Sequence, residues 1–184
     1  MKEQLEIGYE AVGGAFTLQI GATFDGRPLQ SHERTQLRVS GLPESLLWEI
    51  DAPFFDDPLP AAPLGSTAGL WEFEVVELFI SGPAEQYTEI EVGPAGHYLA
   101  LRLDGVRRVI EEGLQLSVDT AVHGGRWRGR VHIPRAILPQ GPHRINAYAI
   151  HGQAAERRYL AAFPSGGEQP DFHRLDSFVE VSLP

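Results

Sequence analysis

Apolar and polar residues alternate through most of the chain. Phe16, Leu18 and Ile20 are separated by single residues of lower hydrophobicity, and Leu37 and Val39 repeat the pattern. A period of two places successive side chains on opposite faces of a β-strand, so such segments are typical of half-buried strands. The pattern predicts strands at residues 16–20, 36–39, 46–50, 73–80, 87–92, 98–103, 114–122, 127–133, 144–151, 158–163 and 177–183.

Turn-forming residues separate these segments about every ten residues. The run from Gly93 to Gly96 is one such turn, and prolines fill a long irregular segment at residues 51–69. Proline has no amide hydrogen to donate to a strand ladder. One helical turn is expected at residues 134–138, with Pro134 at its start. Short strands with frequent turns predict an all-β fold, and we expect two sheets packed as a sandwich.

Length and composition set further limits. The 184 residues suit a single domain, residues 1–184, that is large enough to bury its own core. The absence of cysteine excludes disulfides, thiolate catalysis and cysteine-bound metal. No apolar run is long enough to cross a membrane, and residues 1–9 lack the pattern of a signal peptide. A cytoplasmic location is therefore expected.

The charge balance points away from two classes of partner. The formal net charge is −10, from 25 acidic and 15 basic residues. A field of this sign repels the phosphates of nucleic acid and the surface of anionic membranes. We therefore expect a small-molecule ligand, no nucleic acid and no membrane, and the oligomeric state is left open.

A carboxyl group interrupts the most apolar of the predicted strands, residues 73–80. Glu77 falls on the same face of that strand as Val75 and Phe79. A carboxylate on a buried apolar face needs a partner or a ligand, because burying it unpaired costs several kcal/mol. Arg102 also breaks an apolar strand and is the expected partner. Two interpretations stay open: a structural ion pair, or the floor of a binding site on the outer face of one sheet.

Other residues fit such a floor. Trp71 stands where the irregular segment meets the central strand, and Asn146 faces outward from a late strand. An indole can stack on the C–H face of a sugar while nearby polar groups bind its hydroxyls. Glu89 and Glu91 share one face of the next strand, and we interpret them as solvent-facing structural residues.

Several of these segments carry a resemblance to a known family. The central strands and one later strand resemble those of the family 9 carbohydrate-binding modules and their relatives. Within that superfamily the chain is most similar to a group of small uncharacterised proteins, and the likeness covers residues 70–180. The segments that carry it are 70–79, 87–94, 100–103, 127–134 and 145–150, and for the smaller group His97–Leu103, Ala147–Gly152 and Pro170–Leu175.

The resemblance implies a jelly-roll-like β-sandwich whose sugar-binding members hold the end of a glycan between aromatic side chains. Carried over to this sequence, Trp71 would be one side of the clamp. Glu77, Arg102 and Asn146 would bind the sugar hydroxyls. These roles follow from the resemblance and not from the spacing of the residues.

The sequence departs from that pattern in one place. A second tryptophan is expected shortly after Asn146 and is absent, and His151 or Tyr159 stands nearest to its place. Other relatives with this fold bind haem through a methionine, but the only methionine here is Met1. No cofactor is therefore expected.

The favoured function is a non-catalytic module that binds a small polar ligand, with carbohydrate preferred. Its aromatic residue would lie over a floor of Glu, Arg and Asn side chains, and histidines near strand ends could join it. The predicted ligand-binding residues are Trp71, Glu77, Arg102, Asn146, His151 and His173, with no catalytic residue and no metal ligand.

Two alternatives stay open. A glycoside hydrolase would use two carboxylates among Glu77, Glu89 and Glu91, about 5–10 Å apart, one with a raised pKa. A metal-binding protein would instead bring the histidines together, namely His97, His151 and His173 with Asp171.

Overall fold

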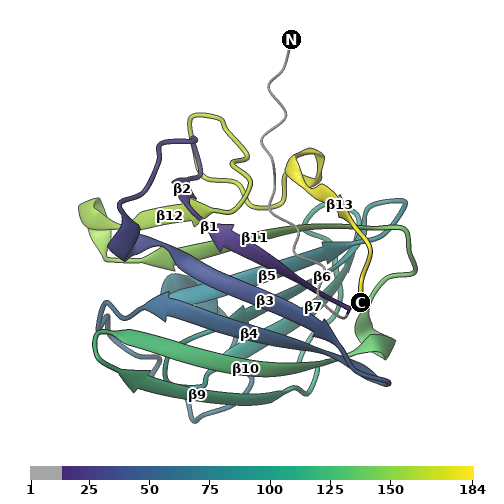
Figure 1. Ribbon diagram of the computed structural model, residues 1–184, viewed down its shortest axis with the longest axis horizontal. Coiled ribbons are helices and arrows are strands. Elements are labelled where there is room, and N and C mark those ends of the chain that lie inside the picture. Colours follow the sequence, from purple (N-terminus) through teal and green to yellow (C-terminus); the bar gives the residue numbers. More distant parts are fainter. Residues whose placement is uncertain (1–13) are drawn as a thin grey trace.

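The computed structural model describes residues 14–184. Two antiparallel β-sheets pack face to face, with the smaller sheet lying over the larger one in the view of Figure 1. The described residues form no α-helix, and no helix among them is long and apolar enough to cross a membrane. The prediction of an all-β, two-sheet sandwich is confirmed.

The smaller sheet has the alternation that its sequence predicts. Along β1, β3 and β10, buried residues alternate with exposed or half-buried ones, so one face packs inward and the other meets solvent. Its five strands, in spatial order, are β1 (Ala15–Ile20), β3 (Thr35–Gly41), β4 (Ser45–Pro53), β10 (Arg126–Pro134) and β9 (Ser117–His123).

The larger sheet differs, because its central strands are buried on both faces. A strand that is covered on both faces has a nearly continuous run of apolar residues in its sequence, and the segment around Phe79 is such a run. Its strands, in order, are β2 (Ala22–Thr23), β12 (Arg158–Ala161), β11 (His143–His151), β5 (Val75–Ser81), β6 (Gln86–Val92), β7 (Tyr98–Asp104) and β8 (Val109–Glu111), and β13 (Val179–Val181) also pairs with β11.

Short 3-10 turns connect several strands. The helical turn predicted at residues 134–138 is confirmed as η3. The turn η2 was not predicted. The central strand follows it and begins at Val75, two residues after the predicted start at residue 73. The five turns are η1 (Ser31–Glu33), η2 (Leu70–Glu72), η3 (Arg135–Ile137), η4 (Ala154–Glu156) and η5 (Leu175–Ser177).

Two hydrophobic clusters lie on opposite faces of the larger sheet. The first fills the space between the sheets and contains Trp48 and Trp127, as expected for tryptophans within alternating strands. The second covers the outer face and is built around Phe79 and Tyr148. Aromatic residues from the C-terminal segment, such as Phe172, close this outer cluster. The outer face is therefore a second packed layer instead of a solvated surface.

Candidate functional site

Three acidic side chains occupy neighbouring positions on the outer face of the larger sheet. Glu77 of β5 is paired with Glu91 of β6, and Glu89 is paired with Phe79. On the other side of β5, Glu77 is paired with Tyr148 of β11. Side chains directly opposite in an antiparallel pair have their Cβ atoms about 5 Å apart. We call Glu77, Glu89 and Glu91 the acidic floor.

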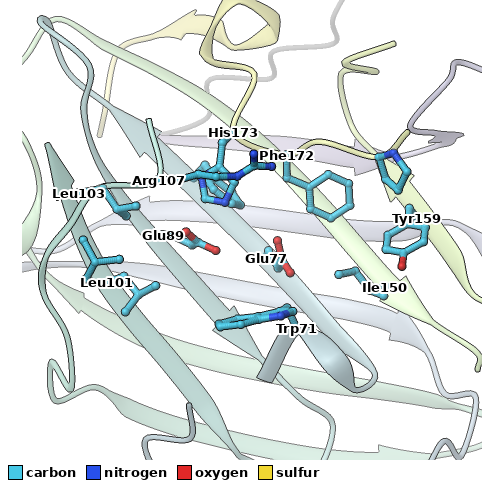
Figure 2. A pocket seen from close by; sticks show the side chains of 13 residues that line it. Trp71, Glu77, Glu89, Leu101, Leu103, Arg107, Ile150, Tyr159, Phe172 and His173 are labelled. Atoms are coloured by element: carbon cyan, nitrogen blue, oxygen red, sulfur yellow. The ribbon is translucent and has the colours of Figure 1, made fainter. Parts of the chain in front are cut away.

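A cavity of about 380 Å³ opens over the acidic floor and is called here the outer-face cavity. Its size is that of a site for a small molecule. In Figure 2 the carboxyls of Glu77 and Glu89 lie in its centre, with Trp71 on one side and His173 on the other. The other lining residues are Phe79, Leu101, Leu103, Arg107, Val109, Ile150, Tyr159, Pro170 and Phe172.

The acidic floor is almost completely removed from water. Glu77, Glu89 and Glu91 are 2%, 5% and 0% exposed. Among the described residues Oε2 of Glu89 has no hydrogen-bond partner, and the groups that approach the Glu91 carboxyl are the Trp71 amide and the Glu89 carboxyl. Glu89 and Glu91 are close enough for one carboxyl to donate to the other when a proton lies between them. The interpretation of Glu89 and Glu91 as solvent-facing is therefore wrong, because the outer cluster covers this face.

Burial controls the protonation of these carboxyls. It raises the pKa of Glu77 well above its ordinary value, and the negative charge of Glu89 adds to this effect while Arg157 opposes it. Burial also raises the pKa of Glu89 to about 7, and that of Glu91 well above its ordinary value. Like charges so close together cannot all ionise. Near neutral pH the acidic floor therefore keeps protons and can both donate and accept hydrogen bonds.

Trp71 forms an aromatic wall that is held in place by its neighbours. Leu70, which precedes it in η2, is fully buried, whereas Trp71 itself is 47% exposed. The Arg157 guanidinium donates hydrogen bonds to the backbone carbonyls of Trp71 and Glu72. These contacts hold the backbone that carries the indole, and the indole itself is an apolar surface that is open to a ligand.

A hydrogen-bonded group forms the opposite wall. The Tyr87 hydroxyl lies 2.7 Å from Nδ1 of His173 and accepts a hydrogen bond of 2.9 Å from the Arg107 amide. Arg107 also pairs with Asp171 at 2.8 Å, and the same carboxylate accepts from the His173 amide at 3.0 Å. These contacts fix the position of the His173 ring.

The same contacts fix the proton of the imidazole. Burial raises the pKa of Tyr87 to about 12 and lowers that of His173 to about 4, so both groups are neutral near pH 7. The Tyr87 hydroxyl accepts a hydrogen bond from the Arg107 amide and is therefore free to donate its own hydrogen to Nδ1 of His173. The imidazole proton then lies on Nε2, and His173 offers a donor to the cavity that it lines.

Arg102 does not pair with Glu77, so the predicted ion pair is wrong. Arg102 lies opposite Thr88 on β6, on the inner face of the larger sheet, whereas Glu77 is on the outer face. Its guanidinium instead contacts Glu111 of β8 at 2.7 Å, and both side chains are more than 40% exposed. The strand β8, which the sequence did not reveal, supplies this partner.

Asn146 is on the outer face but does not line the outer-face cavity. Its amide nitrogen donates to the Tyr148 hydroxyl and to the Phe163 carbonyl, both at 2.8 Å. Its oxygen accepts from the amides of Ala147 and Phe163. The side chain is fully buried and fully used in tying β11 to the segment after β12.

His151 lies in a separate place. Its ring stacks on Phe55 with centroids 3.5 Å apart, and it lines a much smaller cavity together with Glu74. Glu74 accepts hydrogen bonds from the amides of Phe55 and Asp57, so this cluster holds the irregular segment after β4. Burial raises the pKa of Glu74 to about 7 and lowers that of His151 to about 4.

The histidines do not form a common site. Nε2 of His97 lies 3.0 Å from the Ala62 carbonyl, whereas His151 and His173 have the neighbours described above. Within residues 14–184 no group of three or more His, Cys, Asp or Glu side chains could hold a metal ion. The arrangement of the described residues gives the metal-binding alternative no support.

The structure therefore brings together three of the six predicted residues, namely Trp71, Glu77 and His173. It also adds residues that sequence reasoning missed. Arg107 lies in the tight turn between β7 and the unpredicted β8, and Phe172 lies in a segment without regular structure. Tyr159 lines the same cavity as Trp71. The sequence had suggested it only as a residue near the place where the family pattern has its second tryptophan. One signal in the sequence pointed to Phe172: it lies in Pro170–Leu175, one of the segments that resemble the group of small relatives.

Comparison with known proteins places this site in context. No family model matches the chain. A structure of a candidate carbohydrate-binding protein from Bacteroides uniformis superposes with a TM-score of 0.71 at 17% identity, over 91% of this chain and 85% of that one. A family 9 carbohydrate-binding module from Caldicellulosiruptor kristjanssonii, solved with glucose, gives a TM-score of 0.54 at 13% identity, over 82% and 76%. These likenesses show a shared fold.

Similarity in sequence is higher to a group of vertebrate proteins. The UPF0462 protein C4orf33 homolog of Danio rerio is 39% identical over 170 residues, which is 88% of this chain and 86% of the relative. The human UPF0462 protein C4orf33 is 36% identical over 176 residues, or 90% and 87% of the two chains. Identity of this level over nearly the full length of both proteins is more than a shared fold requires, and the chain belongs to the UPF0462 family.

Proposed function

We propose that the protein binds a small polar ligand, a carbohydrate, in the outer-face cavity. Trp71 stacks on the C–H face of the sugar ring, and the carboxyls of Glu77 and Glu89 bind its hydroxyl groups. His173 adds a donor through Nε2. These are the predicted site residues that the proposal keeps, together with Glu89. We also propose that residues 1–184 are one carbohydrate-binding-module-like domain.

One observation carries this proposal: an exposed indole lies across the cavity from two buried carboxyls, and Oε2 of Glu89 has no hydrogen-bond partner among the described residues. A buried carboxyl without a hydrogen-bond partner is costly, and a ligand that donates a hydrogen bond to it removes that cost. A sugar supplies hydroxyl groups for the floor and a flat apolar face for Trp71. Tyr159 and Phe172 line the same cavity and add further aromatic surface.

The fold supports the same conclusion. The Caldicellulosiruptor module was solved with glucose bound, and the Bacteroides structure is of a candidate carbohydrate-binding protein. Both share the sandwich of this chain. A fold can serve many functions, so the weight of the proposal rests on the cavity and its residues.

The test is calorimetric titration of the protein with glucose and with short oligosaccharides. We expect saturable binding, with a dissociation constant in the millimolar to micromolar range for a site of this size. Trp71→Ala should abolish binding with little loss of stability, because the side chain is half-exposed. Trp71→Phe should keep part of the affinity, since an aromatic face remains.

Leu64→Ala is the matched control, because Leu64 is 70% exposed and does not line the outer-face cavity. It should bind as the wild type does. If Trp71→Ala binds sugars as well as Leu64→Ala does, the sugar does not occupy this cavity and the proposal is wrong.

Hydrolysis of a glycoside is the second candidate, and the raised pKa of Glu89 favours it. A general acid that keeps its proton near pH 7 beside a second carboxyl is the arrangement that glycosidases use. Chromogenic aryl glycosides test it directly. Turnover that is lost in both Glu77→Gln and Glu89→Gln would establish the enzyme, and binding without turnover would exclude it for the glycosides tried.

A further inference from the structure

When the acidic floor is ionised, the charges around the outer-face cavity do not balance. Four acidic side chains face it or adjoin it, namely Glu77, Glu89, Glu91 and Asp171. Arg174 adjoins Asp171 but pairs with Asp176, so the two arginines that act on the acidic floor are Arg107 and Arg157. Three other titratable groups nearby, Tyr87, Tyr148 and His173, are neutral near pH 7, because burial shifts the pKa of each away from that region.

Both arginines are already engaged. Arg107 pairs with Asp171 at 2.8 Å, which offsets that carboxylate. Arg157 donates to the carbonyls of Trp71, Glu72 and Gly152, and its guanidinium carbon lies 5.7 Å from the centre of the Tyr159 ring. No cation among the described residues makes an ion pair with the acidic floor, and this deficit is what a ligand can supply.

An ammonium group fits this deficit better than a hydroxyl does. It has up to three N–H groups, one of which can donate a hydrogen bond to Oε2 of Glu89, an atom that otherwise has no partner among the described residues. Its positive charge also offsets the mutual repulsion of the carboxylates. The surrounding aromatic rings favour a cation as well, because its charge is attracted to their faces. Trp71, Tyr159 and Phe172 all line the cavity.

We infer that the ligand carries a protonated amine on its ring, so that the ligand class of the outer-face cavity is an amino sugar. This inference rests on the proposed carbohydrate-binding function and makes it more specific. The amine lies against Glu77 and Glu89, and the apolar face of the ring lies on Trp71.

Binding of a cation is linked to protons in this arrangement. An ammonium group stabilises the ionised form of the acidic floor, so its binding releases a proton from Glu77 or Glu89 to solvent. A neutral sugar has no charge with which to favour that ionised form. The number of protons released therefore distinguishes the two ligand classes independently of affinity.

The experiment is calorimetric titration of the full chain at pH 6.5 with glucosamine, glucose and N-acetylglucosamine. The three sugars share a ring and differ in the group at one position, which carries a charge only in glucosamine. We expect glucosamine to bind at least about tenfold more tightly than the other two, which corresponds to about 1.4 kcal/mol. Repeating the titration in buffers of different ionisation enthalpy should show proton release for glucosamine alone.

The double variant Glu77→Gln/Glu89→Gln replaces both carboxyls by amides of the same shape. It should lose the preference for glucosamine and the proton release, so that whatever affinity remains is the same for glucosamine and for glucose. Glu111→Gln is the matched control, since Glu111 pairs with Arg102 and does not line the cavity. It should retain both properties. A double variant that keeps the tenfold preference would overturn the inference.

Cyclohexylamine separates this inference from the proposed function, because it has a ring and an amine but no hydroxyl group. If glucose binds as tightly as glucosamine and Trp71→Ala abolishes both, the sugar site stands and the amine inference is wrong. If cyclohexylamine binds as tightly as glucosamine and no neutral sugar binds, the amine site stands and carbohydrate binding is wrong. Failure of glucosamine to bind at millimolar concentration would refute the inference.

Discussion

The acidic floor makes a prediction about stability that is independent of any ligand. Glu89→Gln should stabilise the protein above neutral pH and leave it almost unchanged in acid. Burial raises the pKa of Glu89 from its ordinary 4.5 to about 7. Replacing the carboxyl by an amide removes the group that must be ionised in the buried site at high pH.

The magnitude follows from linkage. A carboxyl with a raised pKa in the folded state binds more protons there than in the unfolded state, so stability falls as the pH rises from 4.5 to about 7. Below 4.5 both states are protonated and nothing is lost. Each pKa unit corresponds to about 1.4 kcal/mol, so the ionised Glu89 side chain costs the fold about 3 kcal/mol above pH 7. The variant should recover that amount.

Urea denaturation of the wild type and of Glu89→Gln over a pH series measures this difference. We expect the variant to be more stable by about 3 kcal/mol at about pH 8 and equal within about 1 kcal/mol at about pH 4. For a domain of this length the gain at high pH corresponds to a rise in Tm of about 6–12 °C. Glu111→Gln is the control, and its effect should stay within about 0.5 kcal/mol at every pH, because the side chain is exposed.

A destabilised Glu89→Gln variant at pH 8 would refute this reasoning. It would mean that the ionised carboxylate is held by a favourable partner and that its burial is not the dominant effect. A gain of the same size at pH 4 and at pH 8 would also contradict it, because the protonation of Glu89 would then have no part in the stabilisation.

Three further outcomes follow from the side chains near the site. Asn146→Ala should lower the free energy of unfolding by about 2–4 kcal/mol in urea, because it leaves several buried backbone and hydroxyl groups without partners. Arg102→Gln should change it by less than about 1 kcal/mol and leave ligand affinity intact, since its ion pair with Glu111 is exposed and lies on the other face. His173→Phe should cost about 1–3 kcal/mol by removing the acceptor of the Tyr87 hydroxyl. It should also weaken sugar binding in calorimetry.

Part of the candidate site could be predicted from the sequence because some signals are local. Glu77 is conspicuous as a single charge in an apolar strand, and Trp71 stands beside a strand that is easy to identify. The pairing of Glu77 with Arg102 failed because alternation tells which residues share a face of one strand only. Which faces of two strands coincide depends on their register, and that register puts Arg102 on the inner face.

The sequence by itself determined that the chain is all-β, and it located most of the strands, because period-two alternation and turn residues act over a few neighbours. Only the tertiary structure decided that the outer face of the larger sheet is covered, since Phe172 and His173 are brought there from the C-terminal segment. That cover and the turn η2 bury Glu89 and Glu91, which look like ordinary surface residues in the sequence. The charge of a carboxyl depends on what surrounds it in space, and for the acidic floor those neighbours come from parts of the chain that are far apart in sequence.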